Sequence, residues 1–209
     1  MAFNISDGLQ PLPPLQPDFL DRLDLSLQRA FDLLSRGALD RRSAAHTPVF
    51  GSLGADGLVS MRTVVLRGFD REAVSLRLHT DRRSPKFTDL QREPRCSMLV
   101  YDPGHRIQLR IDGIAGLHTD DAVADTQWAR TQPMSRLVYG VPGAPGSAIE
   151  DPGAATQGLS QVDEATQRAH FAVVDLDVRR IDWLYLSSAG NRRARFERDD
   201  GWAGRWCMP

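Results

Sequence analysis

Residues 61–70 read Met-Arg-Thr-Val-Val-Leu-Arg-Gly-Phe-Asp, and this stretch points to the fold class. Its β-branched and aliphatic run predicts a strand over Leu58–Leu66, which pairs with Val49–Leu53 around the turn Gly54-Ala-Asp-Gly57. Arg62 then stands on a strand, where its planar guanidinium is suited to bind an anion through two hydrogen bonds.

Neighbouring segments alternate between apolar and polar residues, as strands with one buried face do. In Arg106–Ile111, positions 107, 109 and 111 take one face and Gln108 takes the other; Val74–His79 follows the same rule. The other predicted strands are Cys96–Tyr101, Phe171–Leu186, Arg193–Arg198 and Trp202–Met208. Together they predict a mainly β protein, an antiparallel barrel with accessory helices. A Rossmann domain is disfavoured because no G-x-G-x-x-G opens a helix after the first strand.

Three helices are expected between these strands. Phe19–Ser35 carries leucines at steps of three and four and is predicted to end at Gly37. Ser84 is a candidate N-cap with Pro85 at the first helical position, giving a helix to about Glu93. A further helix is expected from Thr119 to about Arg130.

The domain organisation is expected to be simple. Residues 1–17 are rich in proline and predict an extended arm, and residues 18–209 suit a single domain. Residues 132–158 are broken by prolines and glycines. That segment is either a mobile cover over a substrate cleft or a surface insertion.

Composition excludes several classes of function. A formal charge of −1 gives no overall field that favours nucleic acid or a membrane surface. No signal peptide or apolar span is visible, so a cytoplasmic protein is expected. Cys96 is predicted to be a buried strand residue, and neither it nor Cys207 has metal-ligand spacing, so no metal site is predicted.

An ordered set of motifs resembles the pyridoxamine 5'-phosphate oxidase-like, FMN-binding split-barrel family. The motifs lie between about Phe19 and Pro209, nearly the whole chain. They are Arg62–Asp70, His79-Thr80 followed by Ser84-Pro-Lys86, Glu93-Pro-Arg95, Ile107-Gln-Leu109, Trp128 to Ser135, and Arg195-Phe196 with Trp202 and Trp206. The resemblance implies an antiparallel split β-barrel, FMN as cofactor, and a homodimer with FMN between the subunits.

A cationic site for the FMN phosphate is expected at Arg62 and Lys86, since Lys86 lies in the first turn of its helix. Where many relatives have an arginine before this lysine, the chain has Pro85, and Arg82 or Arg83 could compensate. The resemblance implies backbone contacts from Val64 to Arg67, a Thr80 hydroxyl contact and a Gln108 contact with the flavin ring system. The expected cofactor-binding residues are Arg62, Thr63, Val64, Val65, Leu66, Arg67, His79, Thr80, Lys86, Gln108, Tyr185 and Arg195, although Tyr185 could equally pack in the core.

The substrate side departs from the oxidase pattern. Trp128 and Gln132 stand where the family has a tyrosine and a phosphate-binding arginine; Arg67 replaces a lysine, and Ser135 is kept. Arg130 or Arg136 could substitute for the missing arginine from a different geometry. Pyridoxine 5'-phosphate is therefore expected to be a poor substrate, and Trp128 is expected to offer a flat wall to an uncharged or aromatic ligand. No catalytic side chain is assigned.

The function these features favour is an FMN-binding, flavin-dependent oxidoreductase acting on an unidentified small molecule. Three alternatives stay open: a flavin carrier without turnover, a genuine pyridoxine/pyridoxamine 5'-phosphate oxidase, and a split barrel that has lost its flavin.

Overall fold

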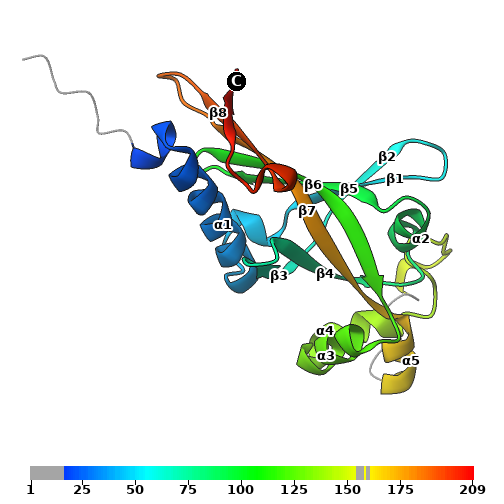
Figure 1. Ribbon diagram of the computed structural model, residues 1–209. Helices are drawn as coiled ribbons and strands as arrows, with labels where there is room; N and C mark the ends of the chain where they lie inside the picture. Colours follow the sequence, from blue (N-terminus) through cyan, green and yellow to red (C-terminus); the bar gives the residue numbers. More distant parts are fainter. Residues whose placement is uncertain (1–16, 154–157, 159–160) are drawn as a thin grey trace, which may run out of the picture.

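The fold is built on one nine-stranded antiparallel sheet (Figure 1). The computed structural model describes residues 17–153, 158 and 161–209, so nearly all of the predicted arm at 1–17 lies outside the described residues. The strands are β1 (Val49–Leu53), β2 (Val59–Thr63), β3 (Leu66–Asp70), β4 (Ser75–Asp81), β5 (Arg95–Asp102), β6 (Ile107–His118), β7 (Phe171–Tyr185), β8 (Arg192–Glu197) and β9 (Arg205–Cys207).

The strand order closes on itself and also branches. Along the order β2-β1-β5-β6-β7-β4-β3, the two end strands are consecutive in the chain, with only Val64 and Val65 between them. The first half of β7 pairs with β4, whereas Arg180–Tyr185 pairs with β8, which in turn pairs with β9. The sheet therefore divides along β7, and the mainly β, antiparallel split-barrel fold expected from the sequence is confirmed.

One predicted strand is in fact two. The run Leu58–Leu66 breaks after Thr63: the Val64 N–H still donates to the Pro48 carbonyl at 3.0 Å, but Pro48 has no N–H with which to continue the ladder. The chain then starts β3 at Leu66, opposite Leu78. This break places Arg62 and Arg67, which the sequence pattern put on one strand, on two strands.

Three longer helices lie around the sheet: α1 (Leu23–Leu39), α2 (Pro85–Arg92) and α3 (Ala122–Arg130). The prediction that the first helix ends at Gly37 is wrong, because α1 continues to Leu39. Gly37 is instead the point where α1 meets the next segment, since a Cβ there would lie 2.6 Å from the Ala45 carbonyl oxygen.

Short helices cover the lower end of the sheet, where α3, α4 (Pro133–Arg136) and α5 (Glu164–His170) gather in Figure 1. Residues 164–170 show no apolar periodicity that would predict α5, because the single buried residue of this helix is Gln167. Trp128, Tyr139, Phe171 and Val173 form a small core there, separate from the main core inside the barrel.

No helix among the described residues is long and apolar enough to cross a membrane.

Candidate functional site

Arg62, Thr80 and Lys86 come together from three elements, and we call these three residues the cationic seat. Arg62 lies on β2, Thr80 near the end of β4 and Lys86 in the first turn of α2. Lys86 Nζ donates to Thr80 Oγ1 at 2.6 Å, and Arg62 Nη1 donates to Ser52 Oγ at 2.8 Å. The partners of both cations are hydroxyl groups rather than carboxylates.

The charges of the cationic seat are therefore not neutralised. Within the described part of the chain, neither Arg62 nor Lys86 has an ion pair within 4.0 Å. The pKa of Lys86 is lowered to about 8. Burial is the main cause, the nearby positive charge of Arg62 adds to it, and Asp81 has a smaller opposing effect. Burial also lowers the pKa of Arg62. Two desolvated like charges destabilise each other until an anion binds between them, which fits the phosphate of FMN.

The start of α2 adds backbone donors to this seat. Ser84 occupies the N-cap position as predicted, but its Oγ donates to the Asp81 carbonyl at 2.7 Å and caps no helical N–H. Pro85 has no N–H to satisfy. The N-terminal end of the helix dipole thus faces the region of Lys86 without a side-chain acceptor, which favours an anion.

The two arginines that could replace the family's missing arginine are engaged elsewhere. Arg82 forms an ion pair with Asp120. Arg83 Nη2 pairs with Asp81 at 2.7 Å, and its Nη1 donates to the Val141 carbonyl at 3.0 Å. Neither guanidinium is left unpaired for a phosphate.

A second feature is a cleft of about 340 Å³ that includes five of the predicted site residues: Leu66, Arg67, His79, Gln132 and Ser135. Its other lining residues include Arg41, Gln127, Arg130 and Thr131. The cleft and the cationic seat both lie near the end of β4, where His79 lines the cleft and the next residue, Thr80, contacts Lys86 from the other face of the strand. We call it the arginine cleft, after Arg41, Arg67 and Arg130.

Sequence reasoning missed Arg41, and it considered Arg130 only as one of two possible substitutes for the missing arginine. Arg41 follows the C-terminus of α1 and Arg130 ends α3, so the two are 89 positions apart and only the tertiary fold brings them to one cleft. No local motif marks either residue.

Trp128, expected to offer a wall to the substrate, does not line the arginine cleft. Its side chain is 7% exposed and packs on Phe171 with ring centroids 5.2 Å apart. Its Nε1 donates to Glu164 at 3.1 Å, and Arg136 lies over its ring. Trp128 is a core residue because α5, which the sequence did not reveal, covers it.

Gln108 and Arg195 lie on the opposite face of the sheet from Arg62. Arg62 is paired with Phe50, whose side chain is fully buried in the barrel. Gln108 alternates with the buried Ile107 and Leu109, and Arg195 lies between the buried Ala194 and Phe196, so both point outward. One chain does not bring these two residues to the cationic seat.

Tyr185 is a core residue rather than an outward one. It is 7% exposed and stacks on Trp183 with ring centroids 6.4 Å apart. Leu184 is the residue that pairs with Gln108 across the outer face. The reading of Tyr185 as a core aromatic, kept open from the sequence, agrees with this packing.

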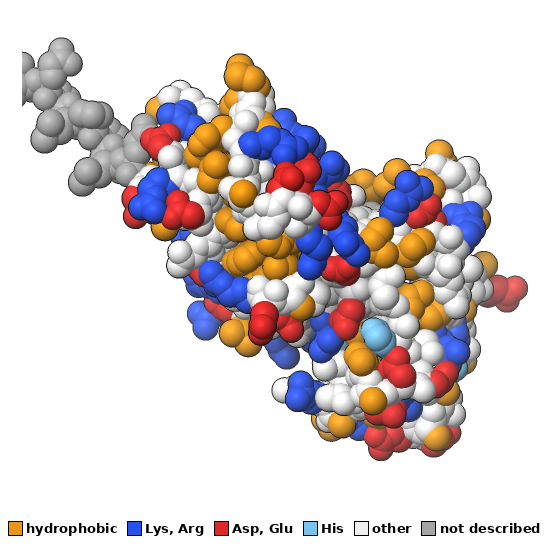
Figure 2. Space-filling model, in the orientation of Figure 1, with side chains coloured by type: hydrophobic (Ala, Val, Ile, Leu, Met, Phe, Trp, Pro, Cys, Tyr) orange, Lys and Arg blue, Asp and Glu red, His pale blue; other side chains and the backbone are white. Residues whose placement is uncertain are grey.

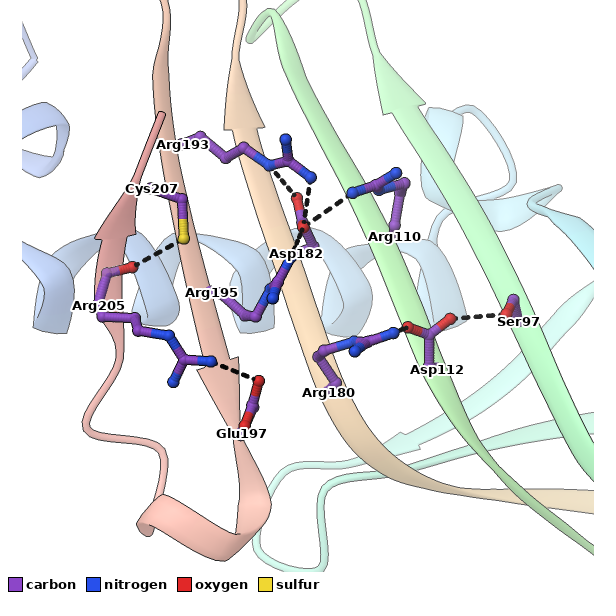
Figure 3. A network of polar contacts seen from close by, with 10 residues as sticks. All are labelled: Ser97, Arg110, Asp112, Arg180, Asp182, Arg193, Arg195, Glu197, Arg205 and Cys207. Carbon is purple, nitrogen blue, oxygen red and sulfur yellow. Dashed lines mark hydrogen bonds and ion pairs between the residues drawn. The ribbon is translucent and has the colours of Figure 1, made fainter. Parts of the chain in front are cut away.

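The outer face carries a cluster of arginines around one carboxylate, and we call Asp182 with Arg110, Arg193 and Arg195 the outer-face cluster (Figure 3). Asp182 is 3% exposed and accepts from Arg110 at 2.9 Å and from Arg193 at 2.8 Å. Burial raises the pKa of Asp182, but the hydrogen bonds from Arg193 and Arg110 outweigh it and keep the pKa below its usual value. Figure 2 shows basic and acidic side chains intermingled on this side of the molecule, with hydrophobic side chains beside them.

The described residues do not support a metal site or a nucleophilic role for Cys96. They contain no group of three or more His, Cys, Asp or Glu side chains that could hold a metal ion. Cys96 is buried as predicted, and burial raises the pKa of its thiol to about 12, so it is no nucleophile at neutral pH.

Comparison with known proteins agrees with this fold and site. Residues 32–119 match the family model of the pyridoxamine 5'-phosphate oxidase FMN-binding domain. Pyridoxine/pyridoxamine 5'-phosphate oxidase 2 of Arabidopsis thaliana is 27% identical over 164 residues, which cover 75% of this chain and 80% of that protein.

Two solved structures extend the likeness beyond the matched domain. A pyridoxamine 5'-phosphate oxidase-related, FMN-binding protein of Nostoc punctiforme has a TM-score of 0.71 at 26% identity, covering 87% of this chain and 96% of that one. PhzG of Burkholderia lata, crystallised with tetrahydrophenazine-1-carboxylic acid, has a TM-score of 0.65 at 22% identity over 97% and 98% of the two chains, which supports the fold alone. The fold is that of the FMN-binding split-barrel proteins, residues 32–119 match the FMN-binding domain of the pyridoxamine 5'-phosphate oxidase family, and the cofactor that this match supports is FMN.

Proposed function

We propose that this protein is an FMN-dependent oxidoreductase that acts on a small molecule as a homodimer. The observation that carries the proposal is the unpaired cationic seat beside a separate cleft. The seat suits the FMN phosphate, and the cleft near the same end of β4 offers room for a second molecule. A flavin carrier without turnover would have no use for that second space.

In this proposal each residue has a limited task. Arg62 and Lys86 bind the phosphate by charge, and the Thr80 hydroxyl, which already accepts from Lys86, fixes the orientation of the ammonium group. Residues 63–67 connect Arg62 of the seat with Arg67 of the cleft, and in this proposal they contact the rest of the cofactor. Bound FMN supplies the redox chemistry itself, because its ring system carries the reactive atoms.

His79 is suited to act as a neutral group beside the flavin. Its pKa is lowered to about 4. Burial is the main cause, the charge of Arg67 adds to it, and a hydrogen bond with Gln127 opposes it. Its Nε2 is buried without a hydrogen-bond partner among the described residues. A neutral imidazole can donate or accept a hydrogen bond there without adding charge to the site.

The homodimer is supported by the positions of residues on the two sheet faces. Arg62 shares the face of the buried Phe50, whereas Gln108 and Arg195 are on the outer face. If all three contact one flavin, Gln108 and Arg195 have to come from a second chain. The outer face also exposes apolar side chains beside the outer-face cluster, with Val59 69% and Met61 64% exposed, and burial of such a patch favours association.

A mixing experiment tests the shared site. Arg62→Ala and Gln108→Ala homodimers should each bind FMN weakly, whereas mixed dimers regain one intact site for every two chains. Binding of FMN measured by flavin fluorescence should therefore rise toward one site per dimer after subunit exchange. No recovery in confirmed mixed dimers, or a monomer by sedimentation with FMN bound, contradicts the proposal.

Turnover needs its own test. The purified protein should be yellow, its flavin should be bleached by NADH or NADPH, and colour should return in air. Bound flavin that dithionite reduces and air reoxidises, but that neither nucleotide reduces, would favour a carrier.

Vitamin B6 phosphate oxidation is a second candidate, favoured by the likeness to the Arabidopsis oxidase. Incubation of the FMN-loaded protein with pyridoxine 5'-phosphate in air separates the two. Formation of pyridoxal 5'-phosphate at about one turnover per second or more would establish this activity.

A further inference from the structure

Lys86 of the cationic seat is the single lysine of the chain, and its amine is buried in part. Its Nζ lies 2.6 Å from Thr80 Oγ1, and within the described ranges it forms no ion pair within 4.0 Å. The carboxylate of Asp81, whose charge acts on Lys86, pairs with Arg83 at 2.7 Å. The amine therefore has no carboxylate partner to hold its proton.

The hydroxyl groups beside Lys86 fix the orientation of this amine. Ser84 Oγ donates its one hydrogen to the Asp81 carbonyl at 2.7 Å, so it can only accept at its 3.3 Å contact with Thr80 Oγ1. The Thr80 hydroxyl thus donates to Ser84 or to the Asp81 carbonyl, and its oxygen accepts from Lys86. One N–H of Lys86 is bound in this way in both protonation states. In the neutral state the lone pair of Nζ is therefore directed away from Thr80.

The neutral state of Lys86 is well populated near neutral pH. Its pKa is lowered to about 8, mainly by burial and then by the charge of Arg62, against a smaller effect of Asp81. Compared with an ordinary lysine, the neutral fraction is roughly a hundredfold larger at pH 7 to 8. Lysines in such surroundings act as nucleophiles, because only the neutral amine has a free electron pair.

The cationic seat also binds the group that a matching electrophile would carry. Arg62 donates to the hydroxyls of Ser52 and Ser60 at 2.8 and 2.6 Å, and the N-terminal end of α2 adds backbone N–H groups, so a phosphate is favoured beside Lys86. In an acyl phosphate, one oxygen atom joins the carbonyl carbon to the phosphorus. A phosphate held at the seat therefore brings an acyl carbon close to Nζ, and such proximity accelerates a reaction strongly.

We propose that Lys86 is a covalent modification site for acyl phosphates in the FMN-free protein. The phosphate group binds at Arg62, Nζ of Lys86 attacks the acyl carbon, the bond from that carbon to the phosphate oxygen breaks, and inorganic phosphate leaves. The nitrogen loses one proton to the phosphate or to solvent, and an amide remains. The amide is uncharged, so the modified seat has one cation instead of two and binds FMN weakly. Bound FMN occupies the seat and protects Lys86.

Acetylation of the FMN-free protein by acetyl phosphate tests the proposal. The reaction is run at about pH 8.5, because a bound phosphate favours the ammonium form of Lys86. Trypsin cleaves after Lys86 only while the amine is free, so mass spectrometry of the uncleaved peptide 84–92 measures the modification. The α-amine of the same chain is the internal standard, since an ordinary α-amine has a pKa of about 7.7–8.0 and is mostly neutral under these conditions.

Lys86 should be acetylated roughly ten times faster than the α-amine, or more. Saturating FMN or inorganic phosphate should slow the reaction of Lys86 alone, and Arg62→Gln should slow it about tenfold. Arg82→Gln is the matched control, because Arg82 also precedes α2 but pairs with Asp120, and it should change the rate less than about twofold. By fluorescence titration, the acetylated protein should bind FMN roughly tenfold more weakly than the unmodified protein.

A second acetyl donor shows whether the phosphate matters. p-Nitrophenyl acetate carries no phosphate, so it should show no preference for Lys86 over the α-amine. The same preference with this donor, equal rates at the two amines with acetyl phosphate, or no protection by bound FMN overturns the inference. These measurements need neither flavin reduction nor a substrate, so such a result leaves the proposed oxidoreductase function standing.

Discussion

Two groups of basic residues on this molecule look alike in sequence and differ in structure. In the outer-face cluster, Arg110, Arg193 and Arg195 share the buried carboxylate of Asp182. In the cationic seat, Arg62 and Lys86 meet only hydroxyl groups. The first group satisfies its own charge and stabilises the fold, whereas the second leaves its charge for a ligand. The position of the nearest carboxylate, and not the number of basic residues, distinguishes a group that stabilises the fold from a group that is free to bind an anion.

The largest expected effect is on stability, at the outer-face cluster. Asp182→Asn removes the one carboxylate that three guanidinium groups share and leaves like charges beside each other. Lost charge-assisted hydrogen bonds contribute about 1.5–3 kcal/mol each in protected sites, and these arginines are partly exposed, so we expect the free energy of unfolding to fall by about 2–3 kcal/mol in total. Urea denaturation measures it.

Asp112→Asn provides the matched control on the same face. Asp112 pairs with Arg180, and their side chains are 32% and 45% exposed, so the loss should stay below about 1 kcal/mol. Equal losses of unfolding free energy in the two variants would show that the burial of Asp182 does not make its ion pairs more stabilising than an exposed pair.

The next effect is on FMN affinity, at the cationic seat. Arg62→Ala and Lys86→Ala should each weaken FMN binding roughly tenfold to over a hundredfold, with no loss of stability in the FMN-free protein, because each removes one of two repelling charges. Arg62→Lys should also lose affinity, since an ammonium group cannot form the planar fork. Fluorescence titration gives the affinities. A variant that unfolds more easily but binds FMN normally would reverse the roles of the two regions.

The pH dependence of FMN affinity also tests whether the charge of Lys86 is unpaired. The lowered pKa of Lys86, about 8 without ligand, rises when a phosphate binds, so binding takes up a proton above pH 8. FMN affinity should then fall as pH increases above about 8. Lys86→Arg should remove this slope, because a guanidinium stays protonated. A wild-type affinity that is constant from pH 7 to pH 10 contradicts an uncompensated Lys86.

The smallest effect is expected at Arg83, three residues from Lys86 but paired with Asp81. Arg83→Ala should change FMN affinity less than about twofold, since its charge is already neutralised. It should speed amide exchange around residues 141–142, whose carbonyls it binds. A tenfold loss of FMN affinity would mean that Arg83 does replace the arginine the family has before its lysine.

The sequence predicted the strands well because each has a buried face that appears as alternation. Ile107, Leu109 and Ile111 are fully buried, as their spacing required. The pattern failed where tertiary contacts set the boundary, as at Gly37, which is buried against Ala45, and at α5 with its single buried residue. Residues 154–157 of the predicted 132–158 loop lie outside the described part of the chain.

The cationic seat was predictable in part because Arg62 and Lys86 sit in ordered motifs. Trp128 was misread because the helix that covers it left no signal, and Arg41 was missed because 26 positions and a hairpin separate it from Arg67. Strand alternation alone could have assigned Tyr185 to the core. Ile181 and Trp183 are buried, so Tyr185 shares their face and Leu184 faces outward.

The central claim is that the unpaired charges of Arg62 and Lys86 bind the phosphate of FMN. Its most direct test compares FMN with riboflavin, which lacks the phosphate, in the wild type and in the Arg62→Ala/Lys86→Ala double variant. We predict that the wild type binds FMN at least a hundredfold more tightly than riboflavin, and that this ratio falls to near one in the double variant while riboflavin affinity is unchanged. An unchanged ratio in the double variant would show that the phosphate binds elsewhere.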